Sequence, residues 1–254
     1  MNKEIIARNF SRYAHLYDRF ADIQKRAALE IIGGMENDGF SDILEIGCGT
    51  GNYTLLLRDK FKEASLTAVD ISPRMIDIAR DKLGGKRINF LAADAEVKDL
   101  TAEKYDLITS NACFQWFEDL GKAIQTYRLM LKEKGTILFS IFGPLTFWEL
   151  NAALGETMKR NIPAEKFLNK DKIIEILREN FRSAGIEEAV YEESFASLRD
   201  LLMKIKYSGI NGGGLAGKVQ FSRRSLRDLE RTYLDKFQRM KATYQVFFCR
   251  GQAG

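Results

Sequence analysis

The sequence contains little histidine, cysteine or proline. Its 254 residues include one histidine, three cysteines and three prolines. A single histidine, His15, nearly excludes a histidine-based catalytic triad or metal cluster. Cys48, Cys113 and Cys249 lie far apart and form no CxxC or Cys/His pattern, so the sequence predicts neither a disulfide framework nor a metal site. The few prolines mark no linker, and we expect a single domain.

Long hydrophobic runs are also absent. No stretch approaches the roughly 18 apolar residues of a membrane span, and the first residues lack the apolar segment of a secretory signal. We therefore expect a cytoplasmic protein with no membrane partner. The net charge is only +4, but residues 218–241 hold eight basic and three acidic residues. This excess predicts a solvated helix face or an acidic partner, with nucleic acid less favoured because no RNA-binding signature accompanies it.

The first part of the chain alternates short apolar strands with amphipathic helices. A long helix is expected at 4–34, ending at a Gly-Gly pair. Strands are expected at 42–47, 66–70, 88–94, 105–111 and 136–142, and the helices between them at about 53–61, 72–83 and 120–135. Ser72 and Pro73 suit the N-terminus of the helix that they begin. Strand then helix, repeated, predicts a doubly wound α/β sheet with parallel pairing and right-handed crossovers.

The alternation changes after Phe142. Further helices are expected at 145–160, 169–185, 197–217 and 222–237, the third running into a glycine-rich turn, with strands at 186–195 and 243–251. Helices inserted above such a sheet usually cover the ligand crevice at the carboxyl ends of the strands. We therefore expect the insertions at 143–167 and 197–241 to form a cap over an acceptor site.

A glycine-rich stretch, "ILEIGCGTGNYT", follows the first expected strand. Gly47, Gly49 and Gly51 fall at alternate positions after Glu45. A nicotinamide fingerprint would read G-x-G-x-x-G, so the third glycine comes one position early for a nicotinamide oxidoreductase. The glycines allow a tight turn and close approach of a ligand. A carboxylate at Glu45 would oppose a pyrophosphate, but it suits the ammonium group of a methionine moiety.

Two more acids close the next strands. Asp70 lies 19 residues after Gly51, where a carboxylate can accept both hydroxyls of a ribose. Asp94, followed by Ala95, can accept from an adenine amino group. Each acid alone is more often a helix cap or a turn residue. Their order at successive strand ends after one glycine loop favours a nucleoside that carries methionine.

The motifs "LEIGCGTG", "LTAVDIS", "LAADAE" and "YDLITSNACFQW", across about 40–142, resemble the seven-strand S-adenosylmethionine-dependent methyltransferase family. The resemblance implies that S-adenosyl-L-methionine is the cofactor and S-adenosyl-L-homocysteine the product. It also implies a Rossmann-like sheet of seven strands whose last hairpin is antiparallel. The cofactor-binding residues that it implies are Tyr17, Glu45, Gly47, Cys48, Gly49, Gly51, Asp70, Ile71, Met75, Asp94, Ala95 and Asn111.

The same resemblance divides the single domain, 1–254, into parts. Residues 1–39 are expected to form an N-terminal helical lid and 40–142 the cofactor-binding core. Residues 168–196 and 242–254 are expected to complete the sheet.

A second resemblance covers nearly the whole chain. The segments "FSRYAHLYDRFADIQ", "SNACFQWFEDL", "FGPLTFWELNAA", "LLMKIKYSGIN" and "TYQVFFCRG" are similar to the malonyl-acyl-carrier-protein O-methyltransferases of biotin synthesis. This family esterifies the free carboxylate of a malonyl thioester. The implied partner is an acidic acyl-carrier protein bearing the malonyl group, or malonyl-coenzyme A.

A carboxylate acceptor agrees with the scarcity of histidine. Such a group is ionised at neutral pH, since its ordinary pKa is about 4, so its methylation needs no general base. It does need a cation to hold it. The candidates are Arg199, Lys204, Lys206, Arg223 and Arg224, and the candidates for the pocket wall are Phe114 and Trp116, beside Tyr17.

Other functions remain open at this point. A methyltransferase of the same fold can act on a small free acid such as aconitate, or on a carbon atom of a quinone precursor. A binding module that holds S-adenosylmethionine or a carrier protein without catalysis is the alternative from another class.

Overall fold

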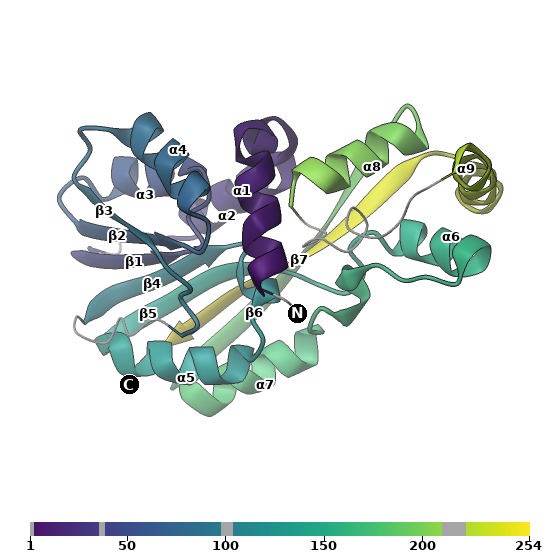
Figure 1. Ribbon diagram of the computed structural model, residues 1–254. Coiled ribbons are helices and arrows are strands. Elements are labelled where there is room, and N and C mark those ends of the chain that lie inside the picture. Colours follow the sequence, from purple (N-terminus) through teal and green to yellow (C-terminus); the bar gives the residue numbers. More distant parts are fainter. Residues whose placement is uncertain (1–2, 36–38, 98–103, 210–221) are drawn as a thin grey trace.

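A seven-stranded sheet forms the centre of the computed structural model (Figure 1), which describes residues 3–35, 39–97, 104–209 and 222–254. The strand order is β3-β2-β1-β4-β5-β7-β6. The strands are β1 (Asp42–Ile46), β2 (Ser65–Asp70), β3 (Ile88–Ala92), β4 (Tyr105–Asn111), β5 (Leu131–Phe142), β6 (Ser183–Ser194) and β7 (Lys241–Gln252). The first five pair in parallel, and β7 runs antiparallel to both β5 and β6. The predicted doubly wound sheet with an antiparallel hairpin at its end is confirmed.

Helices cover both faces of this sheet. They are α1 (Lys3–Phe20), α2 (Asp22–Gly33), α3 (Asn52–Lys60), α4 (Pro73–Leu83), α5 (Leu120–Met130), α6 (Trp148–Met158), α7 (Lys170–Asn180), α8 (Leu198–Tyr207) and α9 (Arg223–Phe237). In Figure 1, α2, α3 and α4 lie on one face, and α5 and α7 on the other. The central strand β1 is therefore buried on both sides, which explains why its apolar residues, Ile43, Leu44 and Ile46, fall on both faces.

Local sequence signals account for the helix that follows β2. The Ser72 hydroxyl accepts a hydrogen bond from the Met75 backbone N–H at 3.2 Å, and Pro73 occupies the first turn of α4. Both features satisfy or avoid backbone donors that a helix N-terminus leaves unpaired. The predicted start of this helix is confirmed.

The N-terminal helical segment differs from the prediction of one helix over 4–34. It breaks at Ala21, which is fully buried and leaves the helical region with ψ at 39°. The break lets α1 pack against α4 and α8 while α2 packs against α3. Helical spacing of apolar residues continues through the break, so the pattern alone does not reveal it.

The helix predicted over 120–135 is also shorter than expected, because α5 ends at Met130. Leu131 already pairs with Tyr105 as the first residue of β5, and the register shifts between Tyr105 and Leu107. Lys132 lies between Asp42 and Asp106, at 2.5 and 3.1 Å from their carboxylate oxygens. Residues 131–135 therefore form part of β5 rather than the end of the helix, although their apolar spacing is helical.

The chain forms helices in both predicted insertions. Helix α6 packs against α9, and α8 packs against α1. These elements share one apolar core with α2 and the ends of β6 and β7. Residues 210–217 of the predicted glycine-rich turn, and Lys218 of the basic segment, lie outside the described residues. Among the described helices, none is both long and apolar enough to cross a membrane.

Candidate functional site

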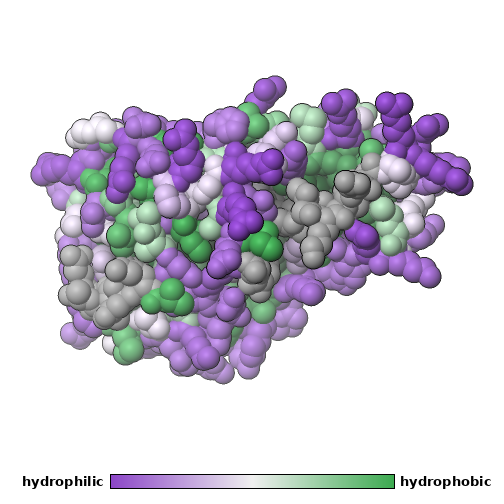
Figure 2. Space-filling model, viewed as in Figure 1, coloured by the Kyte–Doolittle hydropathy of each residue, from purple (hydrophilic) through white to green (hydrophobic). Residues whose placement is uncertain are grey.

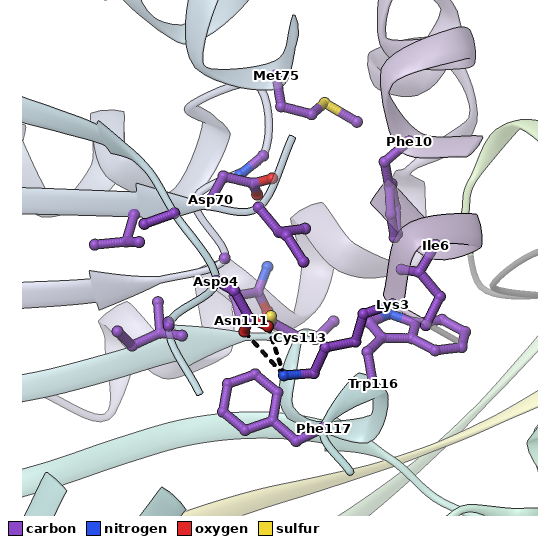
Figure 3. A pocket seen from close by; sticks show the side chains of 18 of the residues that line it. Lys3, Ile6, Phe10, Asp70, Met75, Asp94, Asn111, Cys113, Trp116 and Phe117 are labelled. Atoms are coloured by element: carbon purple, nitrogen blue, oxygen red, sulfur yellow. Dashed lines mark hydrogen bonds and ion pairs between the residues drawn. The ribbon is translucent and has the colours of Figure 1, made fainter. Parts of the chain in front are cut away.

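A pocket lies at the carboxyl ends of β1 to β4, beneath α1 (Figure 3). It encloses about 700 Å³ including its open mouth, a volume typical of small-molecule sites. Ten of the residues predicted for the site line it: Tyr17, Gly47, Gly49, Asp70, Ile71, Met75, Asp94, Ala95, Asn111 and Trp116. Residues from distant parts of the sequence therefore meet in one cavity.

The glycine loop brings the backbone close to this cavity. The N–H groups of Gly47 and Cys48 donate to the Val69 carbonyl at 2.7 and 3.0 Å, which ties the loop to the end of β2. Gly47 has φ of +74° and Gly49 has φ of +55°, values that favour glycine. A Cβ atom on Gly47 would overlap Cys113. Gly51 does not line the pocket; its missing side chain lets α3 and α4 approach each other, since a Cβ atom there would lie 2.9 Å from Leu83.

Asp70 is held in place by two backbone donors. Its carboxylate accepts from the N–H groups of Gly49 at 2.9 Å and Ser72 at 2.8 Å. Burial raises the pKa of Asp70 to about 6, and the two hydrogen bonds oppose the rise. The carboxylate is thus fixed at the pocket wall, with lone pairs left to accept hydroxyl groups of a ligand.

Glu45 lies beneath the loop and is 1% exposed. Neither of its carboxylate oxygens, nor the nearby Thr54 hydroxyl, has a hydrogen-bond partner among the described residues. Burial raises the pKa of Glu45 to about 8; the nearby Thr54 hydroxyl opposes the rise, and the negative charge of Asp70 adds to it. Burying a carboxylate without a close hydrogen-bond partner costs folding free energy. Unlike Asp70, Glu45 is not among the residues that line the pocket, so it lies behind the pocket wall.

Lys3, on the first turn of α1, was not predicted as a site residue. Its ammonium group forms ion pairs with Asp94 at 2.7 Å and Glu96 at 2.6 Å, and Figure 3 shows it reaching across the pocket toward Asp94. The sequence carries no signal for this contact, because 91 residues separate the partners. The contact fixes the start of α1 over the acid that we expect to receive an adenine amino group.

Aromatic rings form the wall of the pocket on the α1 side. Phe10 makes edge contacts with Tyr17 and Trp116, with ring centroids 6.3 and 6.4 Å apart. All three residues line the cavity. Phe10 was missed because its helical spacing indicated only a core-facing position.

Phe114 differs from its neighbour Trp116. It is 1% exposed and stacks on Tyr127 with ring centroids 5.8 Å apart. It also packs against Phe117 and Phe139. Phe114 therefore lies in the core beneath the pocket, while Phe117 is the phenylalanine that lines it.

The structure separates the five basic candidates for holding an acceptor carboxylate. Lys204 has a side chain that is 6% exposed, and its ammonium group pairs with Asp22 at 2.7 Å and Glu193 at 2.9 Å. Its charge is thus already balanced inside the fold. Lys206 is exposed and lies over the rings of Tyr13 and Tyr207. The other three, Arg199, Arg223 and Arg224, are exposed on α8 and α9.

A second, smaller compartment adjoins the main pocket on the other side of the glycine loop. It encloses about 330 Å³ and is lined by Tyr17, Gln24, Lys25, Gly47, Cys48, Gly49, Thr50, Asn52, Tyr53 and Asn111. Cys48 thus faces this compartment. The two spaces share Tyr17, Gly47, Gly49 and Asn111. Together they offer an apolar chamber with acids at its edge, followed by a polar chamber.

The sequence is similar to known methyltransferases. A family described as "Methyltransferase domain" matches residues 43–135. Malonyl-[acyl-carrier protein] O-methyltransferase of Acetivibrio thermocellus is 36% identical, over 98% of this chain and 93% of that protein. The protein of the same name in Priestia megaterium is 33% identical, over 96% of this chain and 95% of the relative.

Solved structures share the fold at lower sequence identity. The YcgJ protein of Bacillus subtilis superposes with a TM-score of 0.64 at 15% identity, covering 90% of this chain and 98% of that one. Phosphoethanolamine N-methyltransferase 2 of Haemonchus contortus, solved with S-adenosyl-L-methionine, gives a TM-score of 0.57 at 19% identity. It covers 96% of this chain and 57% of the other.

Proposed function

The chain belongs to the malonyl-[acyl-carrier protein] O-methyltransferase family, and from this premise we propose how its residues hold the two substrates. It is an S-adenosylmethionine-dependent methyltransferase that esterifies the free carboxylate of a malonyl thioester. We place this reaction early in biotin synthesis, where it prepares the pimeloyl moiety.

The observation that carries the assignment of the site is the unpartnered carboxylate of Glu45. The cofactor combines an adenosine with an amino acid that bears an ammonium group. Glu45 supplies the buried negative charge for that ammonium, behind the loop that contains Gly47. Asp70 accepts the ribose hydroxyls, and Asp94 with Ala95 faces the adenine. The residues present therefore fit the cofactor.

The chemistry needs little from the protein beyond alignment. When bound, S-adenosylmethionine supplies an electrophilic methyl group on a positively charged sulfur. Phe10, Tyr17 and Trp116 exclude water from this region, and their ring faces attract a cation. The acceptor carboxylate is already ionised, so no side chain acts as a general base. Alignment and desolvation of such a pair contribute up to about 7–11 kcal/mol in well-oriented cases.

Basic residues on α8 and α9 support a thioester substrate that is carried by an acidic protein. Lys206 lies on α8 over the Tyr13 ring of α1, the helix that covers the pocket, and we assign it the acceptor carboxylate. Helix α9 presents Arg223, Arg224, Arg227 and Arg231 to solvent. Figure 2 shows hydrophilic side chains gathered at this end of the molecule. We propose that an acidic acyl-carrier protein is the partner that meets them.

A methyl-transfer assay tests the proposed function. Purified protein with S-adenosylmethionine is expected to form S-adenosylhomocysteine with malonyl-acyl-carrier protein and with malonyl-coenzyme A, but not with free malonate. Faster turnover of free malonate or aconitate than of either thioester would contradict the thioester assignment. Binding of the cofactor without turnover of any acceptor would indicate a binding module instead.

A further inference from the structure

The smaller compartment holds one positively charged side chain among its described lining residues, that of Lys25. Lys25 lies on the first turn of α2, one residue after Gln24. The amino-acid end of the proposed cofactor is a zwitterion, so it needs a cation for its carboxylate as well as an anion for its ammonium group. We infer that Lys25 binds that carboxylate, an assignment that rests on the proposed function.

The Lys25 ammonium group is held in the compartment without a strong partner of its own. It donates to the backbone carbonyl of Asp18, in the last turn of α1. Its nearest described carboxylate is Asp22, at 3.8 Å and 59% exposed. Asp22 already pairs with Lys204 at 2.7 Å. The charge of Lys25 is therefore positioned by α1 and remains available to an anion.

Other acids near the compartment are committed elsewhere. The Asp18 carboxylate accepts from Thr50 and from Asn52, the latter at 2.8 Å, and it pairs with Lys82 at 2.7 Å. It thus ties α1 to the glycine loop and to α4 rather than neutralising Lys25. Its contacts also hold Thr50 and Asn52 at the compartment wall.

One of the two charges that a zwitterion requires, that of Lys25, lines this space, and the other, that of Glu45, lies behind one of its lining residues. Glu45 lies near Tyr53, which lines the compartment: burial raises the pKa of the Tyr53 phenol, and the charge of Glu45 adds to the rise. Lys25 lies on the α2 side. Gln24 adds a buried side chain, 5% exposed, whose Oε1 atom has no described partner while its Nε2 donates to Ser208 at 3.0 Å. That oxygen is a further acceptor for an ammonium group.

The test measures binding rather than turnover. We expect Lys25→Met to weaken S-adenosylhomocysteine binding about tenfold or more in calorimetry. The same substitution should change binding of 5′-methylthioadenosine, which lacks the amino-acid end, less than twofold. Lys25→Arg should restore part of the loss. Arg26→Met is the matched control, because Arg26 lies on the same helix with its guanidinium over the Tyr191 ring.

A decarboxylated analogue of S-adenosylhomocysteine completes a cycle between ligand and protein. The loss of binding free energy on removing the ligand's carboxylate and the loss on removing the Lys25 ammonium group should not be additive, because each change abolishes the same ion pair. Additive losses, or equal losses for both ligands, would overturn the inference. Unchanged S-adenosylhomocysteine binding with a raised KM for the malonyl thioester would instead assign Lys25 to the acceptor. If the wild-type protein bound no S-adenosylhomocysteine, the proposed function itself would fail.

Discussion

Gly47 lies directly against Cys113, so that a Cβ atom on Gly47 would overlap both the Sγ and the Cβ atoms of that cysteine. Cys113 follows β4 and lines the same pocket. The absence of a side chain at Gly47 therefore lets the ends of β1 and β4 come together at the pocket. Any side chain at this position must displace either the loop or the segment after β4.

Gly47→Ala is expected to weaken S-adenosylhomocysteine binding by at least about tenfold, because a strained φ combines with a steric overlap. The measurement is calorimetric titration. Gly85→Ala is the matched control, since Gly85 has a similar φ of +81° but no atom within 4 Å of its Cβ position. Equal binding by the two variants would show that the contact with Cys113 does not shape the pocket.

Glu45→Gln is expected to stabilise the ligand-free protein at high pH while weakening cofactor binding. The folded-state pKa of Glu45 is raised to about 8, from 4.5. A raised pKa favours folding below the unfolded-state value, and that contribution is lost as pH rises through the folded-state value. The wild type should thus lose stability between about pH 4.5 and 8, and the variant should lose less.

Chemical denaturation at pH 5 and pH 8.5 measures this difference. We expect the stabilisation by Glu45→Gln to be larger at pH 8.5 than at pH 5 by about 3–4 kcal/mol. The raised pKa of Asp70 also makes the free energy of unfolding fall as pH rises, up to about pH 6, and it does so equally in the wild type and the variant. A stabilisation independent of pH would mean that the Glu45 carboxyl titrates normally in the fold.

Cofactor binding is expected to release a proton at neutral pH. Glu45 is mostly protonated at pH 7 in the free protein, because its pKa is about 8, and a bound ammonium group favours its ionised form. Titration of S-adenosylhomocysteine in buffers of different ionisation enthalpy should show close to one proton released at pH 7 and only a fraction of a proton at pH 8.5. The affinity should accordingly rise with pH up to about 8. Proton release that persists in Glu45→Gln would assign the titration to another group.

The sequence was sufficient to predict the sheet and the acids at its edge. Periodicity located each strand of the parallel half, and Ser72 with Pro73 identified the start of α4. Asp70 and Asp94 follow β2 and β3, and parallel strands bring their carboxyl ends to one edge. These inferences succeeded because they depend on local patterns and on the geometry of parallel sheets.

Contacts that depend on tertiary structure were not predictable. The break at Ala21 lets α1 place Lys3 and Phe10 in the main pocket while α2 places Lys25 in the smaller compartment. Phe114 and Trp116 are two residues apart, yet one faces the core and the other the pocket. Sequence spacing identifies such residues as apolar or charged but does not indicate which cavity they face.

Lys204→Met is expected to destabilise the fold by about 1–2 kcal/mol, because it removes a buried ammonium group from Asp22, which is 59% exposed, and from Glu193, which is 28% exposed. Glu193 also accepts from the Tyr244 hydroxyl at 2.9 Å, so the network joins α2, α8 and the β6–β7 hairpin. Lys206→Met is the control, since Lys206 is two residues away on the same helix and exposed. Thermal denaturation compares the two, and equal melting temperatures would show that the ion pairs contribute nothing.

The arginines of α9 are expected to act on the carrier protein rather than on the methyl transfer. The first turn of α9 contains basic but no acidic residues, an arrangement that the helix dipole disfavours. Arg223 and Arg227 form no ion pair with another described residue, and the nearest acid to Arg231, Asp228, lies at 3.6 Å. Their positive charge is therefore largely unbalanced within the described part of the chain.

Arg223→Glu combined with Arg227→Glu should raise the KM for malonyl-acyl-carrier protein about tenfold, with kcat and the KM for malonyl-coenzyme A nearly unchanged. Added salt should reduce the difference, because exposed charges are screened. Arg87→Glu with Lys122→Glu changes the net charge equally at residues that are 83% and 82% exposed on other helices and loops. An equal rise in KM for that control would show that total charge, rather than the α9 surface, attracts the carrier. A rise in KM for both thioesters would place these arginines at the acceptor pocket instead.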